Sequence, residues 1–213
     1  MTNLPHAKEN KMKEIVIATR NRHKFDEIVQ ILSGIEETTF LFAGDFPALP
    51  EIDETGDTLL ENAIIKAKAT AELLQRPCIA DDTGFFVEAL NGEPGIYAAR
   101  YAGENCSYSD NVDKLLKNMK DKTNRTAYFL TVSVLYCPIK GLIAASEGKV
   151  TGKLTTERQG ISGFGYDPIF IPNDQLQNKT YAQMDDTEKN NISHRYLSIK
   201  GLLNDIPHSP LHS

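Results

Sequence analysis

The chain has 213 residues with 40% hydrophobic and 24% charged side chains, a size and composition that fit one sizeable soluble domain or two tightly joined lobes. Its formal net charge of −6 argues against a nucleic-acid-binding or anionic-membrane surface, although a small basic pocket is compatible with it. No apolar run could span a membrane, no signal peptide is apparent, and three widely spaced cysteines indicate reduced thiols, so we expect a cytoplasmic protein.

The first third of the chain predicts alternating strands and helices. Residues 1–13 are polar and are expected to form a flexible leader before a single domain over residues 14–213. A β-branched run predicts a buried strand over 14–19, helical spacing predicts a helix over 23–32, and 38–42 is a second short strand. Thr58 and Glu61 form a capping-box pattern, which predicts a long helix reaching about Leu74 with Leu60 on its apolar face.

A basic segment joins the first strand to the first helix. Its residues are Thr19, Arg20, Asn21, Arg22, His23 and Lys24. Free backbone N–H groups and the helix dipole favour an anion at such a position. Basic side chains at a helix start oppose the dipole, so either the segment is simply solvated or it binds phosphate, which would explain its charge.

Two adjacent carboxylates mark the centre of the chain. Asp81 and Asp82 follow an apolar lead-in and are expected to end a short buried strand, where ligands bind in α/β proteins. Successive strand residues point to opposite faces, so the two acids should have different roles. They suit metal or water chemistry, but a solvated strand end is an equally good interpretation. Asp53 and Glu54 could join Asp82 as metal ligands, although their spacing favours simple helix-start charges.

The second half predicts a long antiparallel hairpin over 125–137 and 142–150, between a helix at 110–120 and a short strand at 169–171. A loop leads into the glycine-rich motif 163–168, where aromatic rings could form a wall for a flat ligand or simply pack a turn. One final helix is expected over 186–203, with Leu197 in the core and with Lys189, His194 and Arg195 in its early turns.

These segments occur in an order that resembles a known family. The matching segments are 18–24, 53–56 with 61–63, 80–84, 92–101, 163–168 and 193–195. Taken together, they resemble the inosine/xanthosine triphosphate pyrophosphatases. The resemblance implies an α/β fold with a mixed twisted sheet and flanking helices, whose two lobes surround a deep nucleotide-binding cleft, usually in a homodimer. The implied reaction is Mg²⁺-dependent hydrolysis of ITP, dITP or XTP to the monophosphate and pyrophosphate, which keeps deaminated purines out of DNA and RNA.

The resemblance also assigns roles to residues. It makes Asp82 the base that activates water, and it places Mg²⁺ between Asp82 and either Asp53 or Glu54. The family often has Glu where Asp53 stands and Gly where Arg20 stands, so this chain departs from the pattern at both positions. The substrate-binding positions are Thr19, Arg20, Asn21, Arg22, His23, Lys24, Thr83, Phe164, Gly165, Tyr166, Asp167, Lys189, His194 and Arg195.

Two other functions use parts of the same pattern. An enzyme acting on modified pyrimidines or dUTP would need the same metal chemistry with a smaller base pocket. A non-catalytic nucleotide-binding regulator would be expected to lack the acids at 81 and 82, and here they are present. The expected partner is therefore a small nucleotide rather than a nucleic acid or a membrane.

Overall fold

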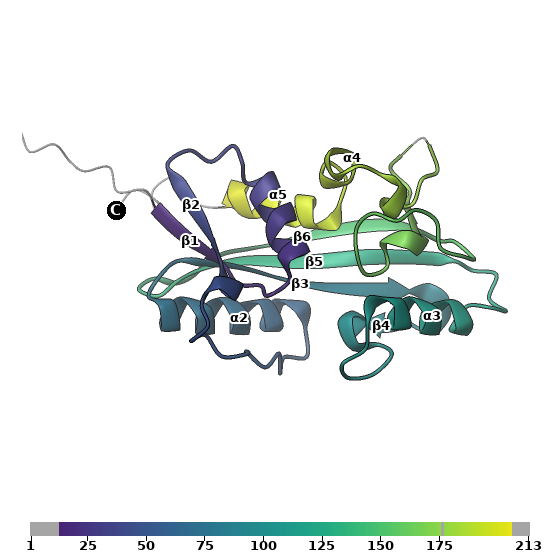
Figure 1. Cartoon of the computed structure of the whole chain (residues 1–213), viewed down its shortest axis with the longest axis horizontal. Coiled ribbons are helices and arrows are strands. Elements are labelled where there is room, and N and C mark those ends of the chain that lie inside the picture. The colour runs from purple at the N-terminus through teal and green to yellow at the C-terminus, as the bar shows by residue number, and fades with distance from the viewer. Residues whose placement is uncertain (1–12, 176, 206–213) are drawn as a thin grey trace, which may run out of the picture.

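The structure is a computed structural model and describes residues 13–175 and 177–205 (Figure 1). Its strands are β1 Lys13–Ile17, β2 Thr38–Phe42, β3 Cys78–Val87, β4 Pro94–Gly95, β5 Thr126–Cys137, β6 Gly141–Leu154 and β7 Phe170–Pro172. Its α-helices are α1 Arg22–Ile31, α2 Leu59–Leu74, α3 Tyr108–Asn118, α4 Asp186–Asn190 and α5 His194–Asp205. Residues 1–12 of the expected leader lie outside the described residues, and β1 begins at residue 13.

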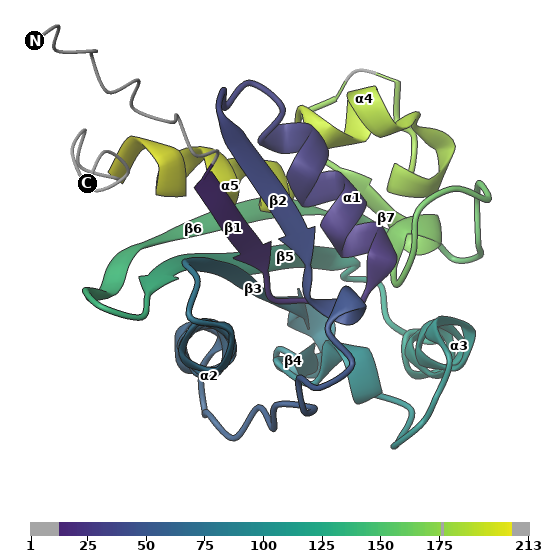
Figure 2. The ribbon, with the colours of Figure 1, turned by 60° about the vertical axis from the view of Figure 1, so that its left-hand side comes forward.

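One mixed sheet runs through the molecule in the order β2-β1-β3-β5-β6-β7, with β4 added to the edge of β3. Strands β1, β2 and β3 pair in parallel, whereas β3, β5, β6 and β7 pair antiparallel. Helices α2 and α3 cover one face, and α1, α4 and α5 cover the other (Figures 1 and 2). In Figure 1 the long strands extend from a left lobe with β1, β2 and α2 to a right lobe with α3 and α4. This arrangement confirms the expected mixed α/β fold.

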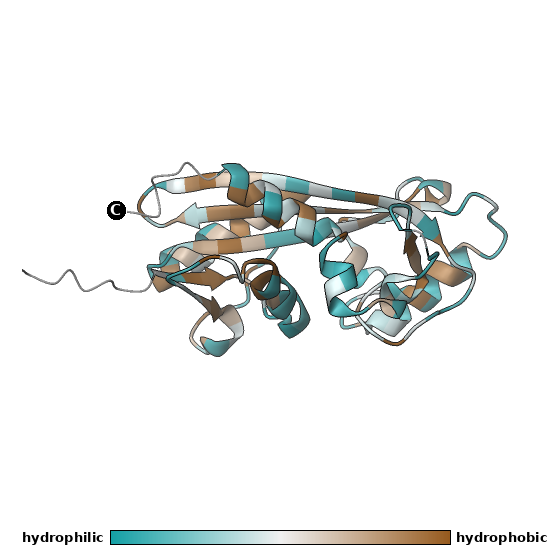
Figure 3. Ribbon diagram, turned by 90° about the horizontal axis from the view of Figure 1, so that it is seen from above, coloured by the Kyte–Doolittle hydropathy of each residue, from teal (hydrophilic) through white to brown (hydrophobic). Residues whose placement is uncertain are grey.

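The β5–β6 hairpin confirms the strongest strand prediction. From Gly148 to Leu154 its residues are alternately buried and exposed, and bands of opposite hydropathy follow one another along the long strands (Figure 3). A Cβ atom at Gly148 would stand 2.0 Å from the carbonyl oxygen of His194. Only glycine therefore lets the start of α5 approach β6 this closely.

The expectation that a short strand ends at Asp81 and Asp82 is wrong. Strand β3 continues to Val87 because every residue of 78–87 pairs with β5. Its other edge is interrupted, since β1 pairs with β3 only at residues 78 and 79 and β4 pairs only at residues 85 and 86. The two carboxylates lie in this interruption, just beyond the carboxyl end of β1.

The single helix expected over 186–203 is also wrong, because the chain forms α4 and α5 with a break at 191–193. The break allows Lys189 on α4 and His194 on α5 to be buried together. Leu197 is instead 40% exposed, as is Leu60 on α2, so neither lies in the core. The capping box of α2 and the bounds of β2 are confirmed. Within the described ranges, no helix is both long and apolar enough to cross a membrane.

Candidate active site

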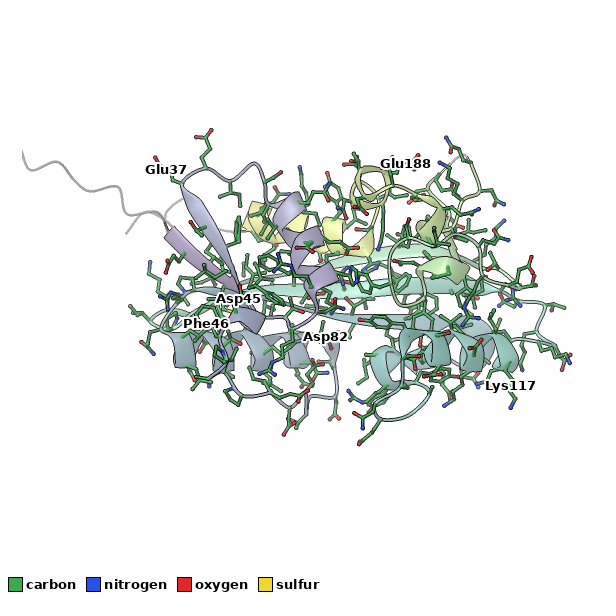
Figure 4. All side chains as sticks on the ribbon, viewed as in Figure 1. Glu37, Asp45, Phe46, Asp82, Lys117 and Glu188 are labelled. Atoms are coloured by element: carbon green, nitrogen blue, oxygen red, sulfur yellow. The ribbon has the colours of Figure 1, made fainter. Side chains whose placement is uncertain are left out.

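Two adjoining cavities lie at the interruption in the sheet, near Asp82, which is close to the middle of the long axis (Figure 4). The first, of ≈ 150 Å³, is lined by Thr83, Phe129, Phe164 and His194, among others, and we call it the inner cavity. The second, of ≈ 290 Å³, is lined by the 18–21 segment and by residues 49–52, and we call it the outer cavity. The residues that line both cavities are Lys24, Glu54, Lys66, Ala99 and Tyr108.

Asp82 points to the α2 side of β3. Its Oδ1 lies 3.6 Å from Lys66 Nζ, which lies 3.0 Å from Glu54 Oε1. Asn62 donates to Asp82 Oδ2 at 3.3 Å and accepts from the backbone N–H of Gly56 at 2.8 Å, so it ties the acidic loop to this carboxylate. Burial raises the pKa of Asp82 and Glu54 adds to the rise, while Lys66 opposes it.

Asp81 is held on the opposite side of β3, as the alternation of strand side chains predicted. Its Oδ2 accepts from Arg195 Nε at 3.2 Å and Nη2 at 3.1 Å, and it lies 3.3 Å from Lys24 Nζ. Burial alone would raise the pKa of Asp81, but Lys24 and Arg195 outweigh burial and hold it well below its usual range. The two neighbouring acids therefore sit in opposite electrostatic environments.

Glu27 on α1 extends the cluster around Asp81. Its carboxylate accepts from Arg195 Nη1 and from Lys189 Nζ, the latter at 2.7 Å. Lys189 also donates to Asp167 Oδ2 at 2.7 Å. Despite burial, attraction to Arg195 and Lys189 lowers the pKa of Glu27, so the carboxylate stays charged. Helices α4 and α5, which carry Lys189 and Arg195, are thereby fixed to α1.

His194 is buried between β5 and α5. Its ring stacks on Phe129 with a centroid distance of 4.4 Å, and its Nδ1 lies 2.6 Å from Thr131 Oγ1. The Thr131 hydroxyl also hydrogen-bonds to Thr83 at 2.8 Å. Burial and the nearby Arg195 hold the pKa of His194 well below its usual range, so the ring is neutral at physiological pH.

Phe164 and Tyr166 of the 163–168 motif both line the inner cavity, but their rings have different surroundings. Phe164 lies under two cations, with Lys189 Nζ 4.9 Å and Arg195 Cζ 5.7 Å from its ring centroid. The Phe164 N–H donates to Asp167 at 2.8 Å, and Gly163 supplies the left-handed φ of 72° that the turn requires. Tyr166 is buried, stacks on Phe85, and donates to Ala98 O. Of the two aromatic rings, Phe164 is the better placed to stack on a ligand.

The basic segment 19–24 is organised by its own asparagine. Asn21 Oδ1 accepts from the backbone N–H groups of His23 and Lys24, so these two helix-start donors already have a partner. Arg20 donates to Leu49 O at 2.5 Å, and its φ is not positive, so the chain accommodates arginine there without backbone strain. Arg22 pairs with Asp26 on the surface, whereas His23 stacks on Phe164 at 5.7 Å.

The two expected metal positions differ in their surroundings. Glu54 lines both cavities beside Lys66, whereas Asp53 is exposed and lines neither cavity. Residues 13–175 and 177–205 hold no group of three or more His, Cys, Asp or Glu side chains able to bind a metal ion by themselves. Mg²⁺ commonly uses only one or two carboxylates and takes its other ligands from water and substrate phosphates. The pair Glu54 and Asp82, which already share the Lys66 ammonium, fits that mode of binding.

Three side chains of the site were missed in the sequence. Lys66 bridges the two acids, Glu27 holds Lys189 and Arg195, and Tyr108 lines both cavities. A signal for Lys66 existed, because Asn62, Lys66 and Thr70 recur every four residues and form a polar stripe on α2. Glu27 and Tyr108 had no such signal.

Known proteins match this chain in both sequence and fold. A sequence model of the Ham1 family matches residues 15–205. The dITP/XTP pyrophosphatase of Halalkalibacterium halodurans is 44% identical over 196 residues, which cover 90% of this chain and 97% of that protein. The structure of the Staphylococcus aureus Ham1 protein superposes with a TM-score of 0.78 at 40% identity, covering 90% of this chain and 97% of its own. The structure of a HAM1 protein from Coxiella burnetii superposes with a TM-score of 0.79 at 36% identity, covering 91% of this chain and 98% of its own.

The agreement is continuous, since the family match extends from β1 to the last residue that the structure describes in α5. It therefore includes every element that contributes to the two cavities. The resemblance inferred from the ordered motifs is confirmed, and this chain belongs to the Ham1 family.

Proposed function

We propose that this protein hydrolyses non-canonical purine nucleoside triphosphates, such as ITP, dITP and XTP, to the monophosphate and pyrophosphate. The observation that supports the reaction most directly is the position of Asp82, a buried carboxylate that lines the inner cavity beside Lys66, which lines both cavities. The relatives named dITP/XTP pyrophosphatase support the substrate class. By removing these nucleotides, the enzyme would keep deaminated purines out of DNA and RNA.

The two cavities suit two parts of a nucleotide. A flat base fits the inner cavity beside Phe164, and the phosphates fit the outer cavity, where Lys24 and Lys66 offer positive charge. Asp82 then lies near the junction, beside the α-phosphorus. Its carboxylate accepts a proton from an attacking water, and Lys66 favours the ionised form that this role needs. Phosphoryl transfer of this kind depends mainly on alignment and charge neutralisation.

Glu54 and Asp82 are the residues that would hold Mg²⁺ together with the substrate phosphates. When bound there, the ion would neutralise charge on the phosphates and on the leaving pyrophosphate. Within the chain itself, Asn62 contributes by tying the loop that carries Glu54 to Asp82. The relative positions of the two carboxylates are therefore set before any ligand arrives.

Selection of the base would take place in the inner cavity. A 6-keto purine offers an acceptor where adenine offers a donor, and a site that leaves a buried polar group unpaired rejects the wrong base strongly. His194 is neutral and lines this cavity, so one ring nitrogen can donate a hydrogen bond while the other accepts one. Arg195 is 1% exposed and already binds Asp81 and Glu27, so it contributes mainly by fixing this wall.

Pyrophosphate release from ITP, dITP, XTP, GTP, ATP and dUTP, with Mg²⁺ and with EDTA, tests the proposal. We expect metal-dependent release from ITP, dITP and XTP, and much slower release from ATP and GTP. A preference for dUTP would retain the metal site and contradict the purine pocket. Orthophosphate as the product would mean that attack occurs at a different phosphorus.

Two further expectations concern the protein as a whole. A homodimer is expected from the resemblance, and light scattering coupled to size-exclusion chromatography should then give twice the mass of 23.7 kDa. A cytoplasmic location is also expected, because the substrates would be intracellular nucleotides. Fractionation of cells expressing the tagged protein would check it.

A further inference from the structure

Tyr108 occupies a position that the proposed reaction leaves without a role. It is the first residue of α3, is 43% exposed, and lines both the inner and the outer cavity. The other residues shared by the two cavities are Lys24, Glu54, Lys66 and Ala99, of which only Ala99 also comes from the wall formed by residues 98–111. Tyr108 is therefore the polar side chain that the 98–111 segment contributes to both cavities, which Lys24 and Lys66 also line.

A hydrogen bond connects Tyr108 to the opposite wall. Asn21 Nδ2 donates to the Tyr108 hydroxyl at 2.6 Å, and Asn21 Oδ1 is held by the first backbone N–H groups of α1. The contact joins α1 on one face of the sheet to α3 on the other (Figure 2). Because the tyrosine oxygen accepts this bond, its own proton remains available, and it has no hydrogen-bond acceptor within the described part of the chain.

Under the proposed function, the junction between the two cavities is where the sugar of the nucleotide would bind. A nucleoside triphosphate with its base beside Phe164 and its phosphates between Lys24 and Lys66 must place its sugar between the two cavities. The Tyr108 ring lies 5.8 Å from the Phe164 ring, so it adjoins the base position. Sugar hydroxyls are good acceptors for a phenolic O–H, and the ring offers an apolar surface to the sugar carbons.

We propose that Tyr108 is a substrate-positioning residue that binds the sugar of the nucleotide, donating a hydrogen bond to a sugar hydroxyl while Asn21 fixes its oxygen. The contact is formed with the bound substrate and is retained as water attacks the phosphate. It therefore contributes uniform binding, which changes KM rather than kcat. This inference rests on the proposed function for the placement of base and phosphates.

Tyr108→Phe tests the contact because it removes the hydroxyl and keeps the ring. Loss of one hydrogen bond corresponds to roughly a 3- to 10-fold change in affinity. We expect KM for ITP to rise by about that factor with kcat nearly unchanged. Tyr97→Phe is the matched control, since Tyr97 is an exposed tyrosine that lines neither cavity, and its KM should stay at the wild-type value.

Direct binding measurements can separate a contact with the sugar from a contact with the phosphates. By calorimetry, Tyr108→Phe should weaken IMP binding by a similar factor and leave inorganic pyrophosphate binding unchanged. A KM increase for ITP but not dITP would identify the 2′-hydroxyl as the acceptor, and an equal increase for both would identify the 3′-hydroxyl. Unchanged KM and unchanged IMP affinity overturn the inference, as does an equal loss of pyrophosphate affinity or a fall in kcat alone.

The two hypotheses fail in different ways. If the wild-type protein released no pyrophosphate from ITP, the proposed function would fall, while IMP binding by wild type and Tyr108→Phe would still decide whether Tyr108 contacts the sugar. If wild type turns over normally and the variant behaves like Tyr97→Phe, only the inference about Tyr108 falls. Equal thermal midpoints of the two variants would exclude loss of folding as the cause.

Discussion

Two clusters of charge lie on opposite sides of β3, and they are built differently. On the α1 and α5 side, three carboxylates face three cations, and we call this the balanced cluster. Its members are Glu27, Asp81, Asp167, Lys24, Lys189 and Arg195. On the α2 side, two carboxylates share one ammonium group, and we call this the acidic cluster, made of Glu54, Asp82 and Lys66.

The difference assigns separate tasks to two adjacent residues of one strand. In the balanced cluster every charge has a close partner and nearly every side chain is buried, so it fixes elements in place and has little capacity for a further cation. The acidic cluster retains one negative charge, and its Glu54 side chain is 31% exposed. Such a cluster is suited to receive a cation with its phosphate ligands.

The largest effect is expected in the acidic cluster, to which the proposed chemistry is assigned. Asp82→Asn removes the proton acceptor while preserving size, so kcat should fall by about 100- to 10,000-fold. Nucleotide binding should persist, and IMP affinity by calorimetry is the check. Near-normal pyrophosphate release from ITP would remove Asp82 from the role of base.

For stability, the balanced cluster should matter more than the acidic cluster. Arg195→Met strands Asp81 and Glu27 as buried, poorly compensated charges, which should lower the free energy of unfolding by about 3–5 kcal/mol. Lys66→Met should cost less, roughly 1–3 kcal/mol, because the pKa of Asp82 is already raised and its carboxylate can take up a proton. Urea denaturation of both variants measures the difference. Equal losses would contradict the distinction between the clusters.

A smaller effect should separate the two neighbouring acids of the loop before α2. Glu54→Gln should raise the Mg²⁺ concentration needed for half-maximal rate by roughly 10-fold, because a weaker ligand replaces a carboxylate at the site. Asp53→Asn is the matched control, since Asp53 is exposed and lines neither cavity. Titration of the rate with Mg²⁺ decides between them, and a larger shift in the Asp53 variant would reverse the assignment.

The smallest effect concerns pH and the neutral ring of His194. Burial lowers the pKa of His194 below its unfolded value of 6.5, so below that pH the unfolded chain binds a proton that the folded protein does not. The free energy of unfolding should therefore decrease as pH falls from 6.5, with a slope of up to about 1.4 kcal/mol per pH unit from this group. Denaturation at several pH values should show a shallower dependence in His194→Gln. Identical slopes would mean that folding does not lower the pKa of His194.

Much of this protein follows from local sequence. The β-branched run before Thr19, the capping box at Thr58 and the strand-like run of the hairpin determine elements through short-range rules, and the structure bears them out. The alternation of strand side chains also predicted that Asp81 and Asp82 would be placed on opposite sides. The order of the motifs along the chain indicated the family, because each motif supplies residues to the same site and must therefore occur in a fixed order.

Tertiary structure decided the rest, because the remaining features depend on partners far apart in sequence. Strand β3 runs past its acids because β5 pairs with all of it, and the interruption that exposes them exists only where β1 stops and β4 begins. Glu27 becomes part of the site only because α4 and α5 bring Lys189 and Arg195 to it. Glu54 rather than Asp53 reaches the cavities because Lys66 and Asn62 on α2 position the loop, and no pattern in the sequence distinguishes the two adjacent acids.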